Sequence, residues 1–286
     1  MATTTQIRPR ERRRGGWMAL PAALWLFLFF LLPLGIVFVV SFMSRGGGGT
    51  IVMPLTLEHY DRIFGVFRPV IIDSIIIALV TTVICFIVGY PLAFYISTRQ
   101  TKTAQNIALF LVILPFWTNF LVRTYAWRII LGNDGVINSL LLGWGIREEP
   151  LQMLNTDFAV LVGLVYGFLP FMVLPIYASI ERFDFRLVEA GHDLGANDWI
   201  AFWRIVFPLT LPGVVAGCIL VLIPSIGAFV TPDLLGGTKG LMIGNLIQGQ
   251  FRGSGNWPLG SAASMVMMGI VFISLLVYMR FGNQQD

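Results

Sequence analysis

The chain has 286 residues, of which 56% are hydrophobic and only 12% are charged, and its mean hydropathy is +0.80. About a quarter of the residues of a soluble globular domain are charged, so this composition excludes that class and indicates a chain surrounded by lipid. The net charge of +4 comes largely from arginines near the N-terminus, which fits orientation in a membrane better than nucleic-acid binding.

The first apolar stretch, residues 17–42, follows a basic tail of residues 1–16. It is long enough to span a bilayer, which takes about 20 residues. The apolar region of a secretory signal peptide is shorter, about 7–15 residues, and five more spans follow, so we expect a retained first helix. The glycine run after Arg45 opens a loop that we expect to be flexible, and this loop completes a first section of residues 17–69.

The second section, residues 70–281, holds five further apolar stretches, and residues 282–286 form the C-terminal end. The predicted spans are 70–98, 105–131, 158–180, 209–230 and 259–281. We expect all of them to be helical, because lipid offers no hydrogen bonds to an open backbone. The predicted fold class is therefore an all-α membrane protein with six transmembrane helices.

Lys and Arg decide the predicted orientation. Their excess on the inner side is modest, but the arginine cluster at residues 8–14 flanks the first helix, which usually dominates. Both termini and the polar segment 183–212 are therefore predicted to be cytoplasmic, in a multi-pass protein of the bacterial inner membrane.

Prolines stand within or beside three of the spans: Pro115, Pro170, Pro175, Pro212 and Pro224. One interpretation is that they interrupt and kink helices that line a pathway which must open and close. The other is that proline is simply more frequent in membrane helices than in soluble ones.

The segment 183–212 reads as two amphipathic helices. Apolar residues recur at helical spacing in each: Leu187, Ala190, Gly191 and Leu194 in the first, and Trp199, Phe202, Trp203 and Val206 in the second. We expect Gly195 to break the two, Asn197 or Asp198 to cap the second, and Pro208 to end it. The small side chains at 190 and 191 would let another surface approach closely, so the segment is a candidate docking element.

No catalytic or metal-binding pattern occurs in the sequence. It lacks H-E-x-x-H, G-x-S-x-G and the phosphate-binding G-x-x-x-x-G-K-[ST], and Cys85 and Cys218 read as packing residues. A membrane enzyme is therefore disfavoured, and the energy for any transport must come from a partner or an ion. A secondary transporter would need ionisable groups at mid-membrane and internal repeats, and neither is evident.

Residues of the docking segment resemble the EAA loop of ABC-importer permeases, whose pattern is E-A-A, three residues, G, nine residues, I, one residue, L-P. Glu189, Ala190, Gly195, Ile205 and Pro208 match it at the same spacing. Two residues depart from the pattern: Gly191 replaces the second Ala and Phe207 replaces Leu. Each keeps the character of its position, which is a small residue at the docking face and a large apolar residue at the helix end. The resemblance implies a type I ABC importer permease fold with this coupling loop between helices 4 and 5. The residues it implies for ATPase coupling are Glu189, Ala190, Gly191, Asp193, Leu194, Gly195, Ile205 and Pro208.

Further motifs are similar to those of spermidine/putrescine importer permeases. These are the segments 115–119, 123–125, 163–166, 169–172, 233–237 and 257–260. They imply a polyamine substrate, with an iron complex, an anion or another organic cation as the alternative, because a shared fold does not fix a ligand. The expected partners are a second, similar permease, two ATP-binding subunits and an external substrate-binding protein. ATP and Mg would be bound by the ATPase, with no cofactor in this chain.

A polyamine pathway would need aromatic faces and carboxylates. A cation over the ring of Trp or Tyr is stabilised by about 0.5–2 kcal/mol, which is enough to attract the substrate but too little to hold it in the pathway. The candidates are Trp117, Asn119, Tyr125, Tyr166 and Asp233. Membrane-interface anchoring or helix packing is the alternative role for the three aromatic residues. Arg123 would oppose a cation path here unless it is paired or turned away.

Overall fold

The computed structural model describes residues 20–99, 101–237 and 240–282. The tail predicted over residues 1–16 lies outside them. Within the described residues, five helices are long and apolar enough to cross a membrane, and the number reaches six if two helices joined at a 92° bend form one span. The prediction of six helical spans is therefore confirmed with one change, which is that the third span is broken.

The long apolar stretches form these elements: η1 (Phe27–Leu31) continued by α2 (Leu32–Val40), α4 (Arg68–Ser97), α5 (Lys102–Ile113) continued by η3 (Leu114–Trp117), α6 (Phe120–Ile130), α8 (Asp157–Glu181), α11 (Phe207–Ile226) and α13 (Trp257–Gly282). The shorter elements are β1 (Met43–Arg45), η2 (Gly47–Gly49), β2 (Ile51–Leu55), α3 (Glu58–Gly65), α7 (Val136–Gly143), α9 (Arg186–Asp193), α10 (Asp198–Ala201), η4 (Phe202–Val206), η5 (Pro232–Gly236), α12 (Ile243–Gln248) and η6 (Gly249–Gly253).

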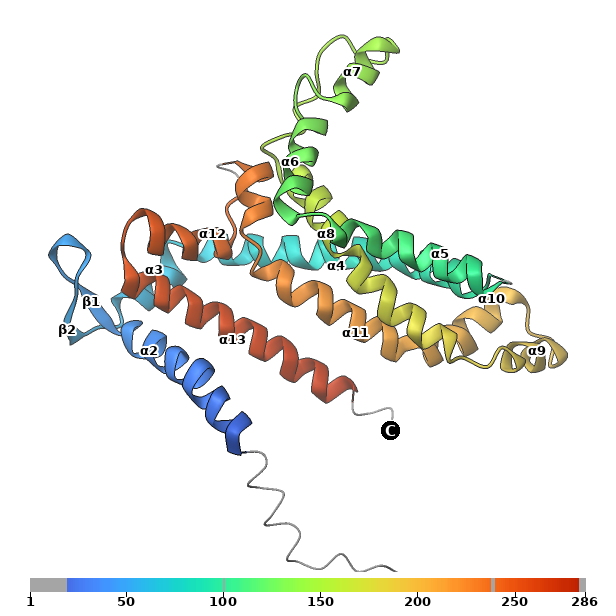
Figure 1. Cartoon of the computed structure of the whole chain (residues 1–286), viewed down its shortest axis with the longest axis horizontal. Helices are drawn as coiled ribbons and strands as arrows, with labels where there is room; N and C mark the ends of the chain where they lie inside the picture. Colours follow the sequence, from blue (N-terminus) through green and yellow to red (C-terminus); the bar gives the residue numbers. More distant parts are fainter. Residues whose placement is uncertain (1–19, 100, 238–239, 283–286) are drawn as a thin grey trace, which may run out of the picture.

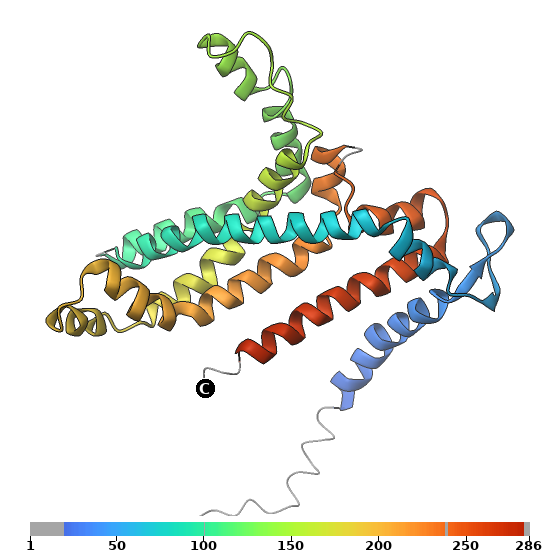
Figure 2. The ribbon, with the colours of Figure 1, turned by 180° about the vertical axis from the view of Figure 1, so that it is seen from behind.

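Helices α4, α8 and α11 pack side by side and form the centre of the molecule (Figures 1 and 2). Buried apolar side chains from all three fill the space between them, among them Ala93, Met172 and Val221. The hydroxyl groups of Tyr90 on α4 and Thr210 on α11 lie 2.9 Å apart, and both residues are buried. This core holds the end of the bundle that carries α9 and α10.

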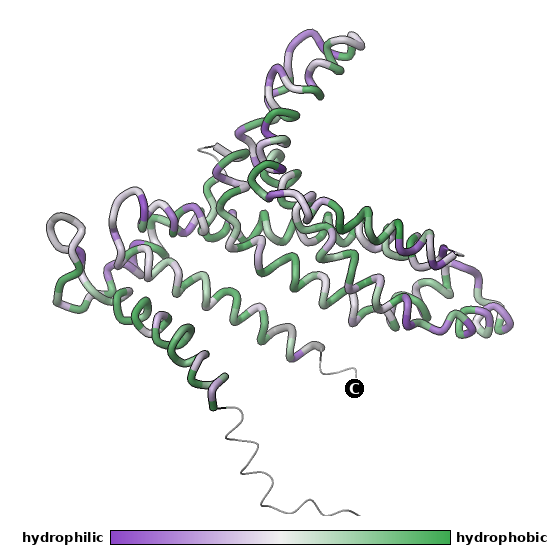
Figure 3. Tube along the Cα trace, viewed as in Figure 1, coloured by the Kyte–Doolittle hydropathy of each residue, from purple (hydrophilic) through white to green (hydrophobic). Residues whose placement is uncertain are grey.

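Helix α2 lies at the edge of the molecule, where it packs against α13 (Figure 1). None of the residues in the most apolar part of its span, Leu20–Val40, is buried. Hydrophobic residues likewise run along the whole length of the long helices, whereas polar residues gather at α9 and in the loop beside α7 (Figure 3). The side surfaces of the helices are therefore suited to lipid or to another membrane chain.

The third predicted span, residues 105–131, is broken, as the interpretation of Pro115 as an interruption expected. Helix η3 ends at Trp117, and α6 starts afresh at Phe120 after a 92° bend. Asn119 has an extended backbone, and its side-chain oxygen accepts a 2.8 Å hydrogen bond from the backbone N–H of Leu121. This is an N-cap, which starts a new helix instead of extending the old one. Beyond the bend, α6 and α7 project sideways from the bundle (Figure 1).

The loop predicted to be flexible after the first span is also more ordered than expected. Strands β1 and β2 pair antiparallel, and α3 follows them. The Arg45 guanidinium donates a 2.7 Å hydrogen bond to the backbone oxygen of Ser254, and His59 Nε2 lies 3.0 Å from the Met43 oxygen. These contacts tie the hairpin to α3 and to the loop before α13.

The prolines interrupt fewer helices than one interpretation of the sequence expected. Helix α8 runs through Pro170 and Pro175, and α11 runs through Pro212 and Pro224. Losing one backbone hydrogen bond costs less in lipid than ending a helix, which would expose several unpaired groups. A sharp break accompanies only Pro115 among these five residues.

Candidate coupling segment and aromatic cluster

The break predicted at Gly195 is confirmed. Gly195 has φ +87°, and its N–H donates a 2.8 Å hydrogen bond to the His192 oxygen, while the N–H of Ala196 donates to the Gly191 oxygen at 3.0 Å. This pair of bonds is a Schellman motif, which favours glycine because other residues are strained at positive φ. Asn197 caps the next helix, since its side-chain oxygen accepts a 2.8 Å bond from the N–H of Ile200. Of the two predicted caps, Asn197 is the one used.

The expectation that Pro208 ends the second helix is wrong. The chain is helical without interruption from Asp198 to Ile226, so α10, η4 and α11 form one rod. The π-helical turn η4 ends with the N–H of Phe207 bonded to the oxygen of Phe202, one residue wider than an α-helical bond. Pro208 follows this turn directly, and the wider π-helical turn accommodates a residue that cannot donate a backbone hydrogen bond inside a helix. The coupling segment is therefore rigidly continuous with the fifth span.

Gly191 does not lie open on a docking face as the sequence suggested. It is buried, and a Cβ at this position would lie 2.7 Å from Cδ1 of Ile205. The space left by the absent side chain is filled by Ile205 of the same segment. Two of the matched motif positions thus hold the two helices against each other, and Ala190 beside them stays exposed.

The outer surface of the segment combines a carboxylate with large apolar side chains. Glu189 and Asp193 are exposed, Leu194 is 89% exposed and Trp199 is 71% exposed. Glu189 makes no ion pair with the part of the chain that the structure describes. The predicted apolar faces are therefore divided, because Val206 turns inward whereas Leu194 and Trp199 face outward. This outward surface is the one a partner could contact.

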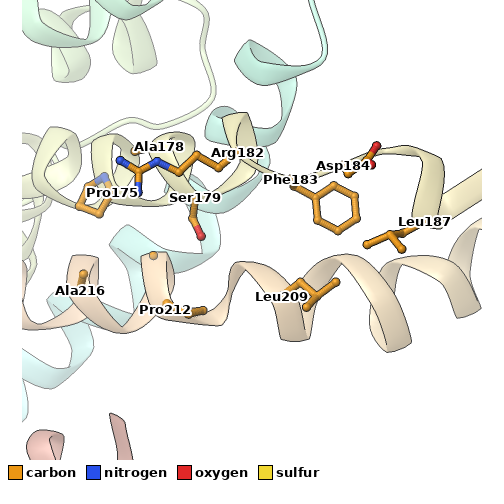
Figure 4. Close-up of a pocket in the computed structure, with 11 residues that line it drawn as sticks. Pro175, Ala178, Ser179, Arg182, Phe183, Asp184, Leu187, Leu209, Pro212 and Ala216 are labelled. Atoms are coloured by element: carbon orange, nitrogen blue, oxygen red, sulfur yellow. The ribbon is translucent and has the colours of Figure 1, made fainter. Parts of the chain in front are cut away.

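A cavity of about 560 Å³ lies where α8 leads into the segment and α11 leaves it (Figure 4). Its lining residues are Pro175, Ala178, Ser179, Arg182, Phe183, Asp184, Leu187, Leu209, Pro212, Gly213 and Ala216. In Figure 4 the Ser179 side chain points toward α11, and the ring of Phe183 approaches Leu209. The cavity lies beside the point where Gly213 brings α11 close to Ser179 and Pro175 of α8.

The candidate pathway residues do not form one cluster. Tyr166 lies at the break in the third span, where its ring is 5.5 Å from that of Trp127. Trp117 packs against Phe110 and is 75% exposed, and Asp233 is exposed in η5. Tyr125 is half exposed. Within the described residues, Tyr166 makes no aromatic contact with Trp117 or Tyr125.

The centre of the aromatic cluster is a residue that the sequence analysis treated as an obstacle. The Arg123 guanidinium lies over the rings of Phe116, Phe120 and Tyr166. The cluster was missed because the positive charge of Arg123 was weighed against a cation path, although Phe116, Phe120 and Arg123 recur at helical spacing. That spacing is the signal that could have found it, whereas Asn119 before an apolar run is a helix-start pattern that marks the bend.

Asn119 has a structural role that competes with the predicted polar contact to substrate. Asn119→Ala is expected to lower the free energy of unfolding by about 1 kcal/mol, because α6 loses its cap. Asn119→Ser restores a capping oxygen and is expected to recover this loss. Thermal unfolding in detergent measures both variants. Equal stability of Asn119→Ala and the wild type would contradict the capping role.

The sequence matches a family of membrane transport proteins over most of its length. The family model described as "Binding-protein-dependent transport system inner membrane component" matches residues 86–283. The spermidine/putrescine transport system permease protein PotB of Haemophilus influenzae is 45% identical over 257 residues, which cover 90% of each chain. PotB of Escherichia coli is 42% identical over 90% of this chain and 93% of its own.

Solved structures share the fold at low identity. A chain of a bacterial ABC transporter involved in importing the acidic polysaccharide alginate superposes with a TM-score of 0.77 at 16% identity, covering 97% of both chains. A chain of the MetNI methionine ABC transporter superposes with a TM-score of 0.56 at 16% identity, covering 75% of this chain and 93% of its own. The arrangement of helices described above is thus the one found in membrane chains of ABC transporters.

Proposed function

This chain belongs to the family of binding-protein-dependent transport system inner membrane components, and we propose that it is the permease subunit of an ATP-driven importer of polyamines. The observation that carries the polyamine assignment is the 42–45% identity to PotB proteins over 90% of the chain. The alginate and methionine importers share the fold at 16% identity and carry no weight on the substrate. An iron complex, an anion or another organic cation is the alternative cargo.

In the proposed assembly this chain pairs with a second, similar permease and encloses half of the pathway. Two ATP-binding subunits dock on the cytoplasmic side and hold both ATP and Mg, so this chain catalyses nothing. An external binding protein delivers the substrate. The proposed orientation puts both termini in the cytoplasm, and the ends of α2 and α13 nearest the termini do point away from the hairpin end (Figure 1).

The coupling surface is the outer side of α9 and the start of α10. Glu189 supplies a charge that a cation on the ATPase can pair with, and Leu194 and Trp199 supply apolar area for a groove. Asp193 adds a second carboxylate beside them. Gly191, Gly195, Ile205 and Pro208 act indirectly, because they shape the segment that presents these side chains.

Movement of the ATPase would reach the pathway through the rod from Asp198 to Ile226. A continuous helix transmits rotation along its length, whereas a flexible joint at Pro208 would absorb it. The close contact of Gly213 on α11 with Ser179 and Pro175 on α8 would pass this movement from one helix to the other. The first span, with no buried residues, is free to contact lipid or the second permease.

Reversing the charge at residue 189 tests the coupling surface. Glu189→Lys is expected to leave the protein inserted but to reduce substrate-stimulated ATP hydrolysis at least about tenfold, because a lost charge pair leaves a repelled or unpaired cation at the contact. ATP hydrolysis by the purified complex is the measurement. The matched control is Glu148→Lys, which makes the same change at an exposed site after α7. Wild-type stimulation in Glu189→Lys would refute this surface.

The substrate has a separate test. The ATPase of the complex is measured with binding proteins loaded with spermidine, sulfate or iron. Stimulation by the spermidine-loaded protein alone supports the polyamine assignment. Stimulation by one of the others, with none by spermidine, moves the assignment to that cargo and leaves the permease role intact.

A further inference from the structure

The break in the third span surrounds one cation with aromatic rings. The guanidinium carbon of Arg123 is 5.5 Å from the ring centre of Phe116, 5.5 Å from that of Phe120 and 5.6 Å from that of Tyr166. All three distances are within the range of about 6 Å at which a ring face attracts a cation. The rings come from η3, α6 and α8: Phe116 and Phe120 are four residues apart in the third span, and the packing of α8 adds Tyr166.

The other partner of Arg123 is a single backbone oxygen. Its Nη1 donates a 2.7 Å hydrogen bond to the carbonyl of Pro115. Among the described residues no carboxylate lies within ion-pair distance of Arg123. Its positive charge is thus met by neutral rings and one carbonyl, and a separate organic cation could use the same set of partners.

Neighbouring rings hold this arrangement in place. Phe116 packs edge-on against Phe171 at 5.1 Å, and Tyr166 packs edge-on against Trp127 at 5.5 Å. These contacts orient two of the three rings independently of Arg123. The rings and the Pro115 carbonyl therefore form a site that would persist if the guanidinium left.

We propose that Phe116, Phe120, Tyr166 and the Pro115 carbonyl form a transit site for an ammonium group of the substrate. Arg123 is a tethered cation that fills this site in the conformation described here. An arriving ammonium takes the hydrogen bond to the Pro115 oxygen as Arg123 gives it up, so the site always holds one positive charge. The ammonium identity of the ligand rests on the proposed polyamine function, whereas the cation site rests on the contacts alone.

This exchange also connects the substrate to the shape of the third span. Arg123 on α6 bonds to Pro115 at the start of η3, on the other side of the bend, so its departure removes a link between the two helices. Occupation of the site by substrate would therefore release α6 from η3. Without substrate, the hydrogen bond from Arg123 to the Pro115 oxygen would keep α6 attached to η3.

Direct binding to the complete complex, reconstituted in lipid discs without the external binding protein, tests the proposal. Calorimetric titration uses two probes, spermidine and methylguanidinium. Arg123→Ala and Arg123→Gln are each expected to bind both probes at least about fivefold more tightly than the wild type, since the competing cation is gone. The Gln variant removes the charge but keeps a polar side chain of intermediate length, so a gain seen in both variants does not reflect a loss of folding.

Two controls distinguish binding by the aromatic rings from a general effect of removing a positive charge. Arg128→Ala removes an exposed positive charge from the same helix and is expected to leave both affinities unchanged. Adding Phe116→Leu to Arg123→Gln is expected to cancel the gain. No gain in either Arg123 variant, an equal gain in Arg128→Ala, or a gain that survives Phe116→Leu would each overturn the cation site.

The two probes also distinguish this proposal from the assigned substrate. A gain for methylguanidinium in a complex that fails to transport spermidine supports the site and refutes the polyamine function. Spermidine transport by the wild type, with no gain in affinity in the Arg123 variants, supports the polyamine function and refutes the cation site.

Discussion

A proline in place of Gly195 is expected to abolish transport while the protein still inserts into the membrane. Proline fixes φ near −65°, whereas Gly195 has φ +87°, and proline has no N–H to donate to the His192 oxygen. The turn between α9 and α10 would have to open, and Glu189 and Trp199 would no longer form one surface. We expect transport to fall below about a tenth of wild type, because a backbone conflict of this kind costs roughly 3 kcal/mol or more.

Asn at the same position is the matched control. Asparagine tolerates positive φ better than other residues that carry a side chain. No atom lies within 4 Å of a Cβ added to Gly195, so the side chain has room. Gly195→Asn is therefore expected to keep most of the transport activity. Radiolabelled substrate uptake, normalised to the amount of protein in the membrane, measures both variants, and wild-type uptake by Gly195→Pro would contradict the role given to this turn.

A leucine in place of Gly213 has the second large expected effect. Gly213 lies where α11 crosses α8, and a Cβ there would lie 2.5 Å from Cβ of Ser179 and 2.6 Å from the Pro175 oxygen. Even alanine would push the helices apart, at a cost of about 1–3 kcal/mol, and leucine would cost more. We expect Gly213→Leu to prevent stable folding and Gly213→Ala to lower the thermal midpoint.

The control for this substitution is Gly269→Leu. Gly269 lies within α13, and no atom stands within 4 Å of an added Cβ. The yield of monodisperse protein in detergent and its thermal unfolding compare the variants. If Gly213→Leu is as stable as Gly269→Leu, the close approach of α8 and α11 described here is wrong.

Hydropathy and local rules predicted the parts of the fold that depend on one segment at a time. Long apolar runs identified the spans, the break at Gly195 followed from its place between two amphipathic helices, and residue type narrowed the cap to Asn197 or Asp198, of which Asn197 is used. These features need no knowledge of neighbours.

The wrong predictions concern where helices end and which residues face a partner. Pro208 was expected to end a helix, but a π-helical turn before it lets the helix continue into the fifth span. Gly191 was expected to face a partner, but Ile205 from the second helix fills its space. The third span was expected to be interrupted at Pro115, but the new helix start at Asn119 was not recognised. The Gly191 contact depends on packing between two helices, whereas the turn before Pro208 and the cap at Asn119 are local features that hydrophobic periodicity does not report.

The candidate substrate residues were the least predictable part. Aromatic residue type alone selected Trp117, Tyr125 and Tyr166, and only Tyr166 joins the cluster at the bend. Phe116, Phe120 and Arg123 are spaced i, i+4 and i+7, a pattern that sequence alone could have placed on one side of the span, whereas Tyr166 joins them from α8. Arg123, set aside as a charge of the wrong sign, occupies the centre of the cluster.

Uptake of spermidine into vesicles tests whether this chain serves an ATP-driven polyamine importer. The vesicles contain the complete complex, with ATP enclosed on the side of α9 and α10. We expect spermidine to accumulate only when both ATP and the external binding protein are present, and we expect Gly195→Pro to abolish the accumulation. Accumulation without ATP, or undiminished accumulation in Gly195→Pro, would contradict this role.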